Sequence, residues 1–159
     1  MRKNEHPSVL IVDDEDMVIT SLRAYLQLET DYQVEGITDP EEAARFLEDR
    51  QVDVVVSDYL MPKMNGIQLL AHAKQLQPEA TRVLLTGHAD KQSAIQAIND
   101  VGLYQYLEKP WENAQLLLVI QNGMERTQLL RNLRDKISEL DLAHSSLKDV
   151  QTRLLKAFL

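Results

Sequence analysis

The sequence contains no cysteine in its 159 residues. Without thiols the chain can form no disulfide framework, no thiolate metal site and no cysteine nucleophile. It also lacks any apolar run near the roughly 20 residues that a membrane-spanning helix needs. Residues 1–7 contain no apolar segment of the kind found in secretory signals. We therefore expect a cytoplasmic protein that has no membrane partner.

Positive charge is scarce as well. The chain has 17 lysines and arginines against 25 aspartates and glutamates, which gives a formal net charge of −8. Nucleic-acid binding relies on basic side chains that neutralise phosphates, so this balance argues against a direct nucleic-acid partner. The apolar fraction of 44% is ordinary for a folded domain. The length suits one domain plus an extension.

The most informative stretch is an apolar run that ends on an acid. Val54–Val56 is β-branched throughout, Ser57 and Asp58 follow it, and the segment from Pro62 to Gly66 is typical of a turn. This pattern predicts a buried strand that delivers Asp58 to its carboxyl end. Such a residue could simply cap the next helix. Alternatively, it lies at the edge where open α/β sheets bind ligands.

Four more segments are predicted to be strands, and stretches of helical period separate them. These strands cover residues 9–12, 33–37, 82–87 and 103–110. Strands and helices that alternate with short links predict a parallel sheet with helices on both faces. Right-handed crossovers then favour a doubly wound α/β fold, with one strand for each of the predicted segments.

Polar side chains stand where these strands end. Asp13 and Asp14 follow the first strand, Asp58 the third, Thr86 the fourth and Lys109 the fifth. Because the carboxyl ends of parallel strands share one edge, we expect these residues to lie close together. Asp13 and Asp14 alone could equally serve only to favour the first turn of the next helix. Three neighbouring carboxylates repel one another unless a cation joins them, so the full set predicts a divalent ion, Mg²⁺ or Mn²⁺.

The predicted site suits phosphoryl transfer. Mg²⁺ keeps several waters and usually binds one or two carboxylates together with a phosphate. Lys109 would supply a positive charge to that phosphoryl group, and the Thr86 hydroxyl would donate a hydrogen bond to it. An aspartate in these surroundings can act as a nucleophile and form an aspartyl phosphate.

With these features the chain resembles the receiver domain of bacterial two-component response regulators. The resemblance rests on motifs spread along the sequence, namely Asp13-Asp14, Ser57 to Pro62 followed by Asn65-Gly66, Leu85-Thr86-Gly87, Gly102, and Tyr106 to Pro110. It covers residues 8–122. It implies a flavodoxin-like fold with a five-stranded sheet in the order 2-1-3-4-5.

The resemblance also implies a role for each matching residue. Asp58 would accept a phosphoryl group from a sensor histidine kinase or a phosphotransfer protein. Asp13 would bind the metal directly and Asp14 would assist it. Asp58 and the backbone carbonyl of Leu60 would complete the set of protein ligands. The chain would have no enzymatic activity of its own beyond self-phosphorylation from a phospho-donor.

The remaining family positions concern charge and switching. Lys109 would pair with the phosphoryl group, and its peptide bond to Pro110 is expected to be cis. Thr86 would move toward the phosphoryl group while Tyr106 turns inward. We expect the face formed by the last two helices and the last strand to change its partners in response.

From residue 112 onward the sequence changes character. No proline follows Pro110 and no glycine follows Gly123, so a helix that would ordinarily end near Gly123 is predicted to continue. Its seam repeats in heptads through Leu130, Leu133, Ile137, Leu140, His144, Leu147, Gln151, Leu154 and Phe158. This pattern predicts a parallel two-stranded coiled coil, whose polar seam residues fix the register, and hence a homodimer. Alternatively, the helix folds back onto its own domain or into a further one.

The sequence thus predicts a tail over 1–7, a receiver over 8–122 and a helical stalk over 123–159 that leads to an output domain. The expected function is a phosphorelay switch read out through the stalk. Two alternatives stay open: a pseudo-receiver that serves as a constitutive dimerisation scaffold, and the regulatory part of an HD-GYP-type cyclic-di-GMP phosphodiesterase. Lys109-Pro110-Trp111 is associated with the latter. A phosphatase of the aspartyl-phosphate type is disfavoured because it needs a second acid where Leu60 stands.

Overall fold

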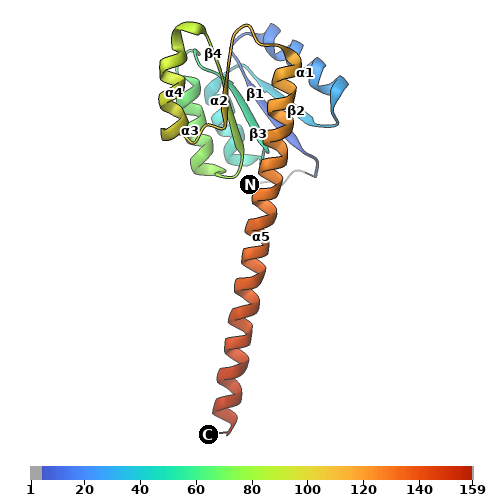
Figure 1. Cartoon of the computed structure of the whole chain (residues 1–159), viewed down its shortest axis with the longest axis vertical. Coiled ribbons are helices and arrows are strands. Elements are labelled where there is room, and N and C mark those ends of the chain that lie inside the picture. Colours follow the sequence, from blue (N-terminus) through green and yellow to red (C-terminus); the bar gives the residue numbers. More distant parts are fainter. Residues whose placement is uncertain (1–4, 159) are drawn as a thin grey trace. The chain divides into compact units, whose positions relative to one another are not determined.

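The computed structural model describes residues 5–158, apart from the side chains of His88 and Phe158 (Figure 1). The strands are β1 (Ser8–Val12), β2 (Gln33–Ile37), β3 (Val54–Asp58), β4 (Thr81–Thr86) and β5 (Gln105–Glu108). The helices are α1 (Asp16–Glu29), α2 (Pro40–Asp49), α3 (Gly66–Leu76), the short η1 (His88–Asp90), α4 (Lys91–Asp100) and α5 (Asn113–Phe158). Each strand predicted from the sequence is present in its expected region.

The strands form one parallel sheet in the order β2-β1-β3-β4-β5. β1 lies between two neighbours, so that Val9 pairs with Val34 on one side and with Val54 on the other. β1, β3 and β4 are buried along their whole length, as expected for central strands that helices cover on both faces. The predicted α/β class, flavodoxin-like fold and strand order 2-1-3-4-5 are confirmed.

Helices cover the two faces of the sheet (Figure 1), and a separate apolar cluster lies on each face. On one face α1 packs with the first turns of α5, and Leu26 and Ile120 are fully buried there. On the other face α2, α3 and α4 contribute Leu47, Leu69 and Ala97. Successive side chains of a strand point to opposite faces, so each central strand feeds both clusters and is fixed in register by them.

Local sequence signals fix where α2 begins and where α4 ends. Asp39 caps α2, because its Oδ1 accepts the backbone N–H of Glu41 at 3.0 Å and Pro40 opens the helix. Gly102 follows the end of α4 with φ at 64°, a conformation that glycine adopts without strain. These local signals therefore account for where α2 begins and where α4 ends.

A buried arginine braces the amino end of β4, which the sequence pattern did not predict. Arg82 is only 4% exposed, and its guanidinium donates hydrogen bonds to the carbonyl oxygens of Gly102, Pro78 and Ala80. Burial lowers the pKa of Arg82, and the nearby Arg126 charge adds to this effect. The guanidinium therefore links β4 to the segment just before it, at Pro78 and Ala80, and to Gly102 after α4.

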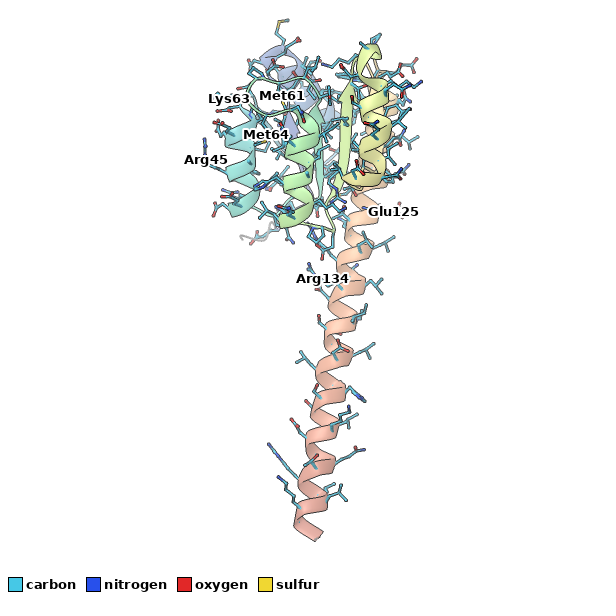
Figure 2. All side chains as sticks on the ribbon, turned by 90° about the vertical axis from the view of Figure 1, so that its left-hand side faces the viewer. Arg45, Met61, Lys63, Met64, Glu125 and Arg134 are labelled. Carbon is cyan, nitrogen blue, oxygen red and sulfur yellow. The ribbon has the colours of Figure 1, made fainter. Side chains whose placement is uncertain are left out.

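Helix α5 runs unbroken from Asn113 to Phe158, so the predicted continuation past Gly123 is confirmed. The chain divides into two compact units, the first ending at Thr127 and the second beginning at Gln128. Side chains stand out from the helix along the second unit (Figure 2). Within the described residues, no helix has the length and apolar character needed to cross a membrane.

The predicted heptad seam lies on this second unit. Five of its large apolar side chains are between 51% and 68% exposed, namely Leu133, Ile137, Leu140, Leu147 and Leu154, whereas Leu130 at the start of the seam is half-buried. His144 and Gln151 are exposed as well, and the side chain of Phe158 lies outside the described part of the chain. From Leu133 to Leu154 the seam is therefore exposed in the single chain, and the coiled coil stays a prediction.

Gly66 gives a test of how the turn after β3 is packed. A Cβ atom at Gly66 would overlap the carbonyl oxygen of Asp58 and would lie 2.9 Å from Leu84 Cδ1. We predict that Gly66→Ala lowers the free energy of unfolding by roughly 2 kcal/mol, because the backbone at Asp58 must shift. Gly87→Ala is the matched control, since its Cβ would meet Asp90 Oδ2 at 3.5 Å. Urea denaturation measures both variants, and equal losses would contradict the prediction.

Candidate functional site

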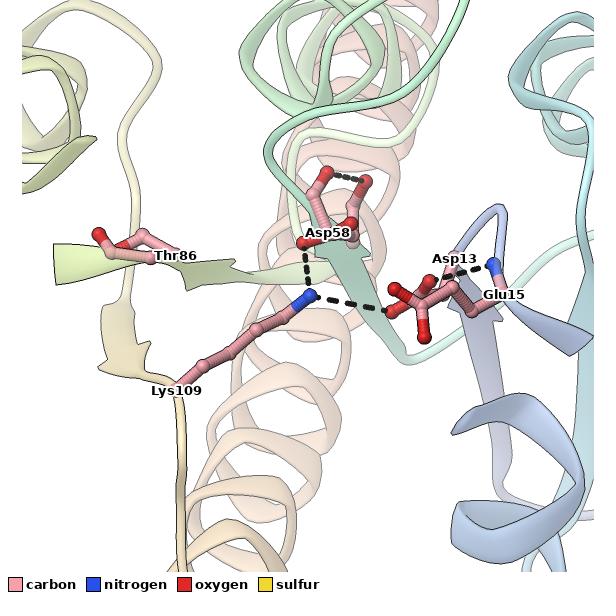
Figure 3. A network of polar contacts seen from close by, with 7 residues as sticks. Asp13, Glu15, Asp58, Thr86 and Lys109 are labelled. Atoms are coloured by element: carbon pink, nitrogen blue, oxygen red, sulfur yellow. Dashed lines mark hydrogen bonds and ion pairs between the residues drawn. The ribbon is translucent and has the colours of Figure 1, made fainter. Parts of the chain in front are cut away.

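Four strands deliver polar residues to one edge of the sheet. Asp13 directly follows β1, Asp58 ends β3, Thr86 ends β4 and Lys109 directly follows β5. The backbone joins the last two, because the N–H of Lys109 donates to the carbonyl oxygen of Thr86 at 2.8 Å. The parallel strand order thus brings together residues that are nearly 100 positions apart in the sequence (Figure 3).

An ion pair lies at the centre of this edge. Lys109 Nζ is 2.9 Å from Asp58 Oδ1 and 3.9 Å from Asp13 Oδ2 (Figure 3). Asp13 is fully buried and Asp58 is 5% exposed. Lys109 therefore contacts two carboxylates that water barely reaches, and the Lys109–Pro110 peptide bond that follows is cis, as expected.

Burial makes negative charge costly at both carboxylates. It raises the pKa of Asp13 from 3.8 to about 6, against the lowering effect of the Glu15 N–H, which donates to Asp13 Oδ1 at 2.9 Å. Burial likewise raises the pKa of Asp58, and the hydrogen bond and charge of Lys109 offset this only in part. The single positive charge of Lys109 thus does not fully stabilise the charged forms of the two buried carboxylates.

At Lys109 the attraction of the neighbouring carboxylates outweighs the effect of burial on the pKa. Burial by itself lowers the pKa of Lys109, but the hydrogen bond and charge of Asp58 and the charges of Asp13 and Glu15 outweigh it, so that the pKa is raised overall. Lys109 is therefore held as a cation beside the carboxylates. The pKa of Asp58 in the same pair is also raised, because the free-energy cost of burying its charge exceeds the stabilisation that the single charge of Lys109 provides.

The residues present fit a divalent cation. One carboxylate oxygen from each of Asp13, Asp14 and Asp58 lies within 4.8 Å of the other two. Asp13 Oδ2 is buried and accepts no hydrogen bond from the residues that the structure describes. All the donors are oxygens, which hard cations such as Mg²⁺ prefer, and the exposed Asp14 leaves room for bound water.

A cavity of about 300 Å³ opens beside Asp58. Its lining comprises Asp14, Glu15, Asp58, Leu60, Gly87, Asp90 and Lys109. Glu15 and Asp90 were not singled out from the sequence. Glu15 could have been found as part of the acidic run from Asp13 to Asp16, whereas Asp90 reaches the cavity through the η1 turn, which no periodic pattern signals.

The two switch candidates lie apart from the ion pair. The Thr86 hydroxyl is fully buried and donates to the carbonyl oxygen of Gly87 at 3.0 Å, so it is turned away from Asp58 (Figure 3). Tyr106 is half-buried and packs against the cluster on the α2–α4 face. Trp111 is partly buried and packs against the opposite cluster, so it contributes to the core.

A flavodoxin-like sheet whose carboxyl edge holds clustered aspartates and a paired lysine is the arrangement of a receiver domain. Comparison with known families agrees: the family model described as "Response regulator receiver domain" matches residues 9–121. The chain therefore belongs to the response regulator receiver family of two-component signalling. Membership in this family accounts for the residue types at the edge of the sheet.

Individual relatives place the chain among regulators. It is 29% identical over 139 residues to the hydrogenase transcriptional regulatory protein HoxA of Cupriavidus necator, covering 87% of this chain but 28% of HoxA. It is 33% identical over 146 residues to the two-component response regulator PprB of Pseudomonas aeruginosa, covering 89% of this chain and 50% of PprB. The chain thus spans half or less of these relatives.

A solved structure supports the same family. The signal receiver domain of an HD domain-containing protein from Pseudomonas fluorescens Pf-5 superposes with a TM-score of 0.75 at 33% identity. The superposition covers 83% of this chain and 96% of that one. The likeness therefore extends over nearly the whole of that receiver.

Asp13 gives a prediction for stability against pH. Its pKa of about 6 in the folded protein exceeds the ordinary 3.8, so between these values the folded state binds more protons and stability falls as pH rises. Asp13→Asn keeps an oxygen for the Glu15 N–H. In metal-free buffer it should raise the free energy of unfolding by roughly 1–3 kcal/mol near pH 7.5 and change it little near pH 4.

Urea denaturation of the Asp13→Asn variant at both pH values tests this. Asp14→Asn is the control, because Asp14 is exposed while its neighbour is buried. A gain in Asp13→Asn that is the same at both pH values, or that Asp14→Asn matches, would show that the cost of burying charge at Asp13 is not the cause.

Proposed function

We propose that this chain accepts a phosphoryl group on Asp58 from a sensor histidine kinase or a phosphotransfer protein. The observation that carries the proposal is the Asp58–Lys109 pair at 2.9 Å, set among three carboxylates at one sheet edge and beside an open cavity. A carboxylate oxygen of Asp58 attacks phosphorus, the bond from phosphorus to the donor breaks, and the new acyl phosphate lies next to the Lys109 cation.

The metal ligands are part of the same proposal. Asp13 binds Mg²⁺ or Mn²⁺ directly, Asp14 assists through water, and Asp58 and the backbone carbonyl of Leu60 complete the protein ligands. The bound ion supplies positive charge to the phosphoryl oxygens. The buried Asp13 Oδ2 supports this assignment, because it lacks a hydrogen-bond donor among the described residues and lies 3.9 Å from Lys109 Nζ.

Switching would begin at Thr86. Its hydroxyl donates to the carbonyl of its own neighbour, Gly87, a bond that a phosphoryl oxygen can replace at little cost since both acceptors are strong. Tyr106 then turns inward from its half-buried position. α4 and the segment before β5 leave Ile95, Ile98 and Tyr104 exposed, which favours this face as the one that changes its partners.

The output would pass through a dimeric stalk. The apolar seam side chains from Leu133 to Leu154 are more than half exposed in the single chain, and a second copy would bury them. Charge supports a parallel pair, since Lys136 at a g position would face Asp141 at the following e position of the second copy. His144 and Gln151 lie within the seam, where polar residues select the register.

Other functions are less well supported. A pseudo-receiver that is only a scaffold would not need the complete set of Asp13, Asp58, Thr86 and Lys109 at one edge. HoxA is named a transcriptional regulatory protein and the solved neighbour belongs to an HD domain-containing protein. We propose that this receiver and stalk regulate an output domain of one such kind, with self-phosphorylation as the only chemistry of the chain.

Intact mass spectrometry tests the proposed function. After incubation with Mg²⁺ and acetyl phosphate, the wild type should gain one phosphoryl group and Asp58→Asn should gain none. Asp49→Asn is the matched control, because it makes the same change at the exposed end of α2 and should label like the wild type. Labelling that persists in Asp58→Asn, or that needs no divalent ion, would contradict the proposal.

The stalk is tested by the molar mass of the full chain in sedimentation equilibrium. Leu140→Asp places two charges in the seam of a dimer and should weaken association more than a hundredfold, about 3 kcal/mol or more. Leu142→Asp is the matched control, because Leu142 is 70% exposed on the same helix but lies outside the heptad seam. A wild type that is monomeric, or equal weakening in both variants, would contradict the coiled coil.

A further inference from the structure

A buried pair of hydroxyls lies at the amino edge of the sheet, opposite the phosphoryl site. Thr81 begins β4 and Thr127 lies on α5, and both are fully buried. Their Oγ1 atoms are 2.8 Å apart. Buried hydroxyls need hydrogen-bond partners to offset their loss of water, so the atoms around this pair define a network.

The network joins three segments of the first unit. The Thr127 hydroxyl donates to the carbonyl oxygen of Asp53, just before β3, at 2.7 Å, and it accepts the backbone N–H of Thr81 at 3.1 Å. The Thr81 hydroxyl lies 2.8 Å from the carbonyl oxygen of Gly123 on α5 and 2.8 Å from Thr127 Oγ1. Each hydroxyl has one proton, so Thr127 donates to Asp53 while Thr81 donates to Gly123 or to Thr127, and both protons are used within the network.

Gly123 makes this close approach possible. A Cβ atom at Gly123 would lie 2.7 Å from Thr81 Cγ2, so no other residue lets α5 come this near to β4. Glycine within a helix costs about 1 kcal/mol relative to alanine. The helix therefore carries a locally unfavourable residue at the point where it is hydrogen-bonded to the sheet, four residues before Thr127 and the end of the first unit.

The position of the network links it to the proposed site. β4 bears Thr81 at its first residue and Thr86 at its last, so one strand connects the hydroxyl pair with the switch threonine. The network is also the last set of buried polar contacts on α5 before the second unit begins at Gln128. If β4 shifts, α5 must therefore shift with it, or the hydrogen bonds of this network must break.

We propose that Thr81, Gly123 and Thr127 form a latch, a set of contacts that fixes the rotation of α5 about its own axis relative to the sheet. Through β4, this latch transmits a change at the phosphoryl site to α5, at the point where the stalk begins. The transmission part rests on the proposed function, because it needs a phosphoryl signal at Asp58. Thr127 is a positioning residue in this scheme. It touches no reacting atom and acts by holding the helix against β3 and β4.

Hydrogen exchange of the metal-free full chain tests the latch itself. Thr127→Val removes the hydroxyl and keeps the shape of the side chain. Thr152→Val is the matched control, since Thr152 Oγ1 donates to Lys148 O at 3.0 Å on an exposed part of the same helix. We expect the α5 amides around Thr127 to exchange about tenfold faster in Thr127→Val while those of β1 stay unchanged. Equal exchange in the two variants overturns the latch.

Exchange with Mg²⁺ and beryllofluoride tests the transmission. Activation should change the exchange of the same α5 amides in the wild type, and Thr127→Val should reduce that change to less than about a third. Thr127→Ser restores a hydroxyl and should recover the response, which a loss of packing alone would not explain. A wild type that takes up phosphate without any response in α5, or a Thr127→Val variant that responds fully, overturns the proposal.

Phosphate incorporation, measured by mass on the same wild-type protein, separates the two proposals. If Asp58 takes up no phosphate, the proposed function fails, while the metal-free exchange of Thr127→Val still decides whether the latch holds α5. If Asp58 takes up phosphate and the metal-free exchange is unaffected by Thr127→Val, the function stands and the latch fails.

Discussion

Burial of negatively charged carboxylates at one sheet edge is the constraint on which the rest of the structure depends. Asp13 and Asp58 are almost fully buried, and their pKa values are raised even though Lys109 Nζ is 2.9 Å from Asp58. The edge thus holds more negative charge than one lysine offsets. A divalent cation would offset this buried charge and, in the proposed function, would act with Lys109 to prepare the edge for a dianionic phosphoryl group.

The fold maintains this unfavourable arrangement through its central strands. β1, β3 and β4 are covered on both faces, so the apolar burial of the valines and leucines in them fixes where the charged residues at their ends must lie. Gly66 lets the chain pass close to the backbone of Asp58. At the other edge, the bonds between Thr81 and Thr127 tie the same strand β4 to α5. One sheet therefore connects the charged edge to the helix that leaves the domain.

Much of this could be predicted from the sequence, because strong local signals agreed with the global fold. Apolar runs followed by Asp13, Asp58 and Lys109 sufficed for the strands and the shared edge, and the resemblance to receiver domains supplied the strand order. The bonds of Arg82 and Thr127 could not be predicted, since each depends on backbone carbonyls brought close only by the tertiary fold. Gly123 illustrates the same limit: the sequence predicted that the helix continues past it, but not that it lies in close contact with Thr81 of β4.

Binding of Mn²⁺, followed by the loss of its free-ion electron paramagnetic resonance signal, tests the central claim most directly. The account predicts a single site per chain that Mg²⁺ empties by competition. Asp13→Asn should abolish it, because the one carboxylate oxygen that is buried without a hydrogen bond among the described residues is then gone. If the wild type binds no ion, or if Asp13→Asn binds as tightly as the wild type, then a cation does not offset the buried negative charge at this edge.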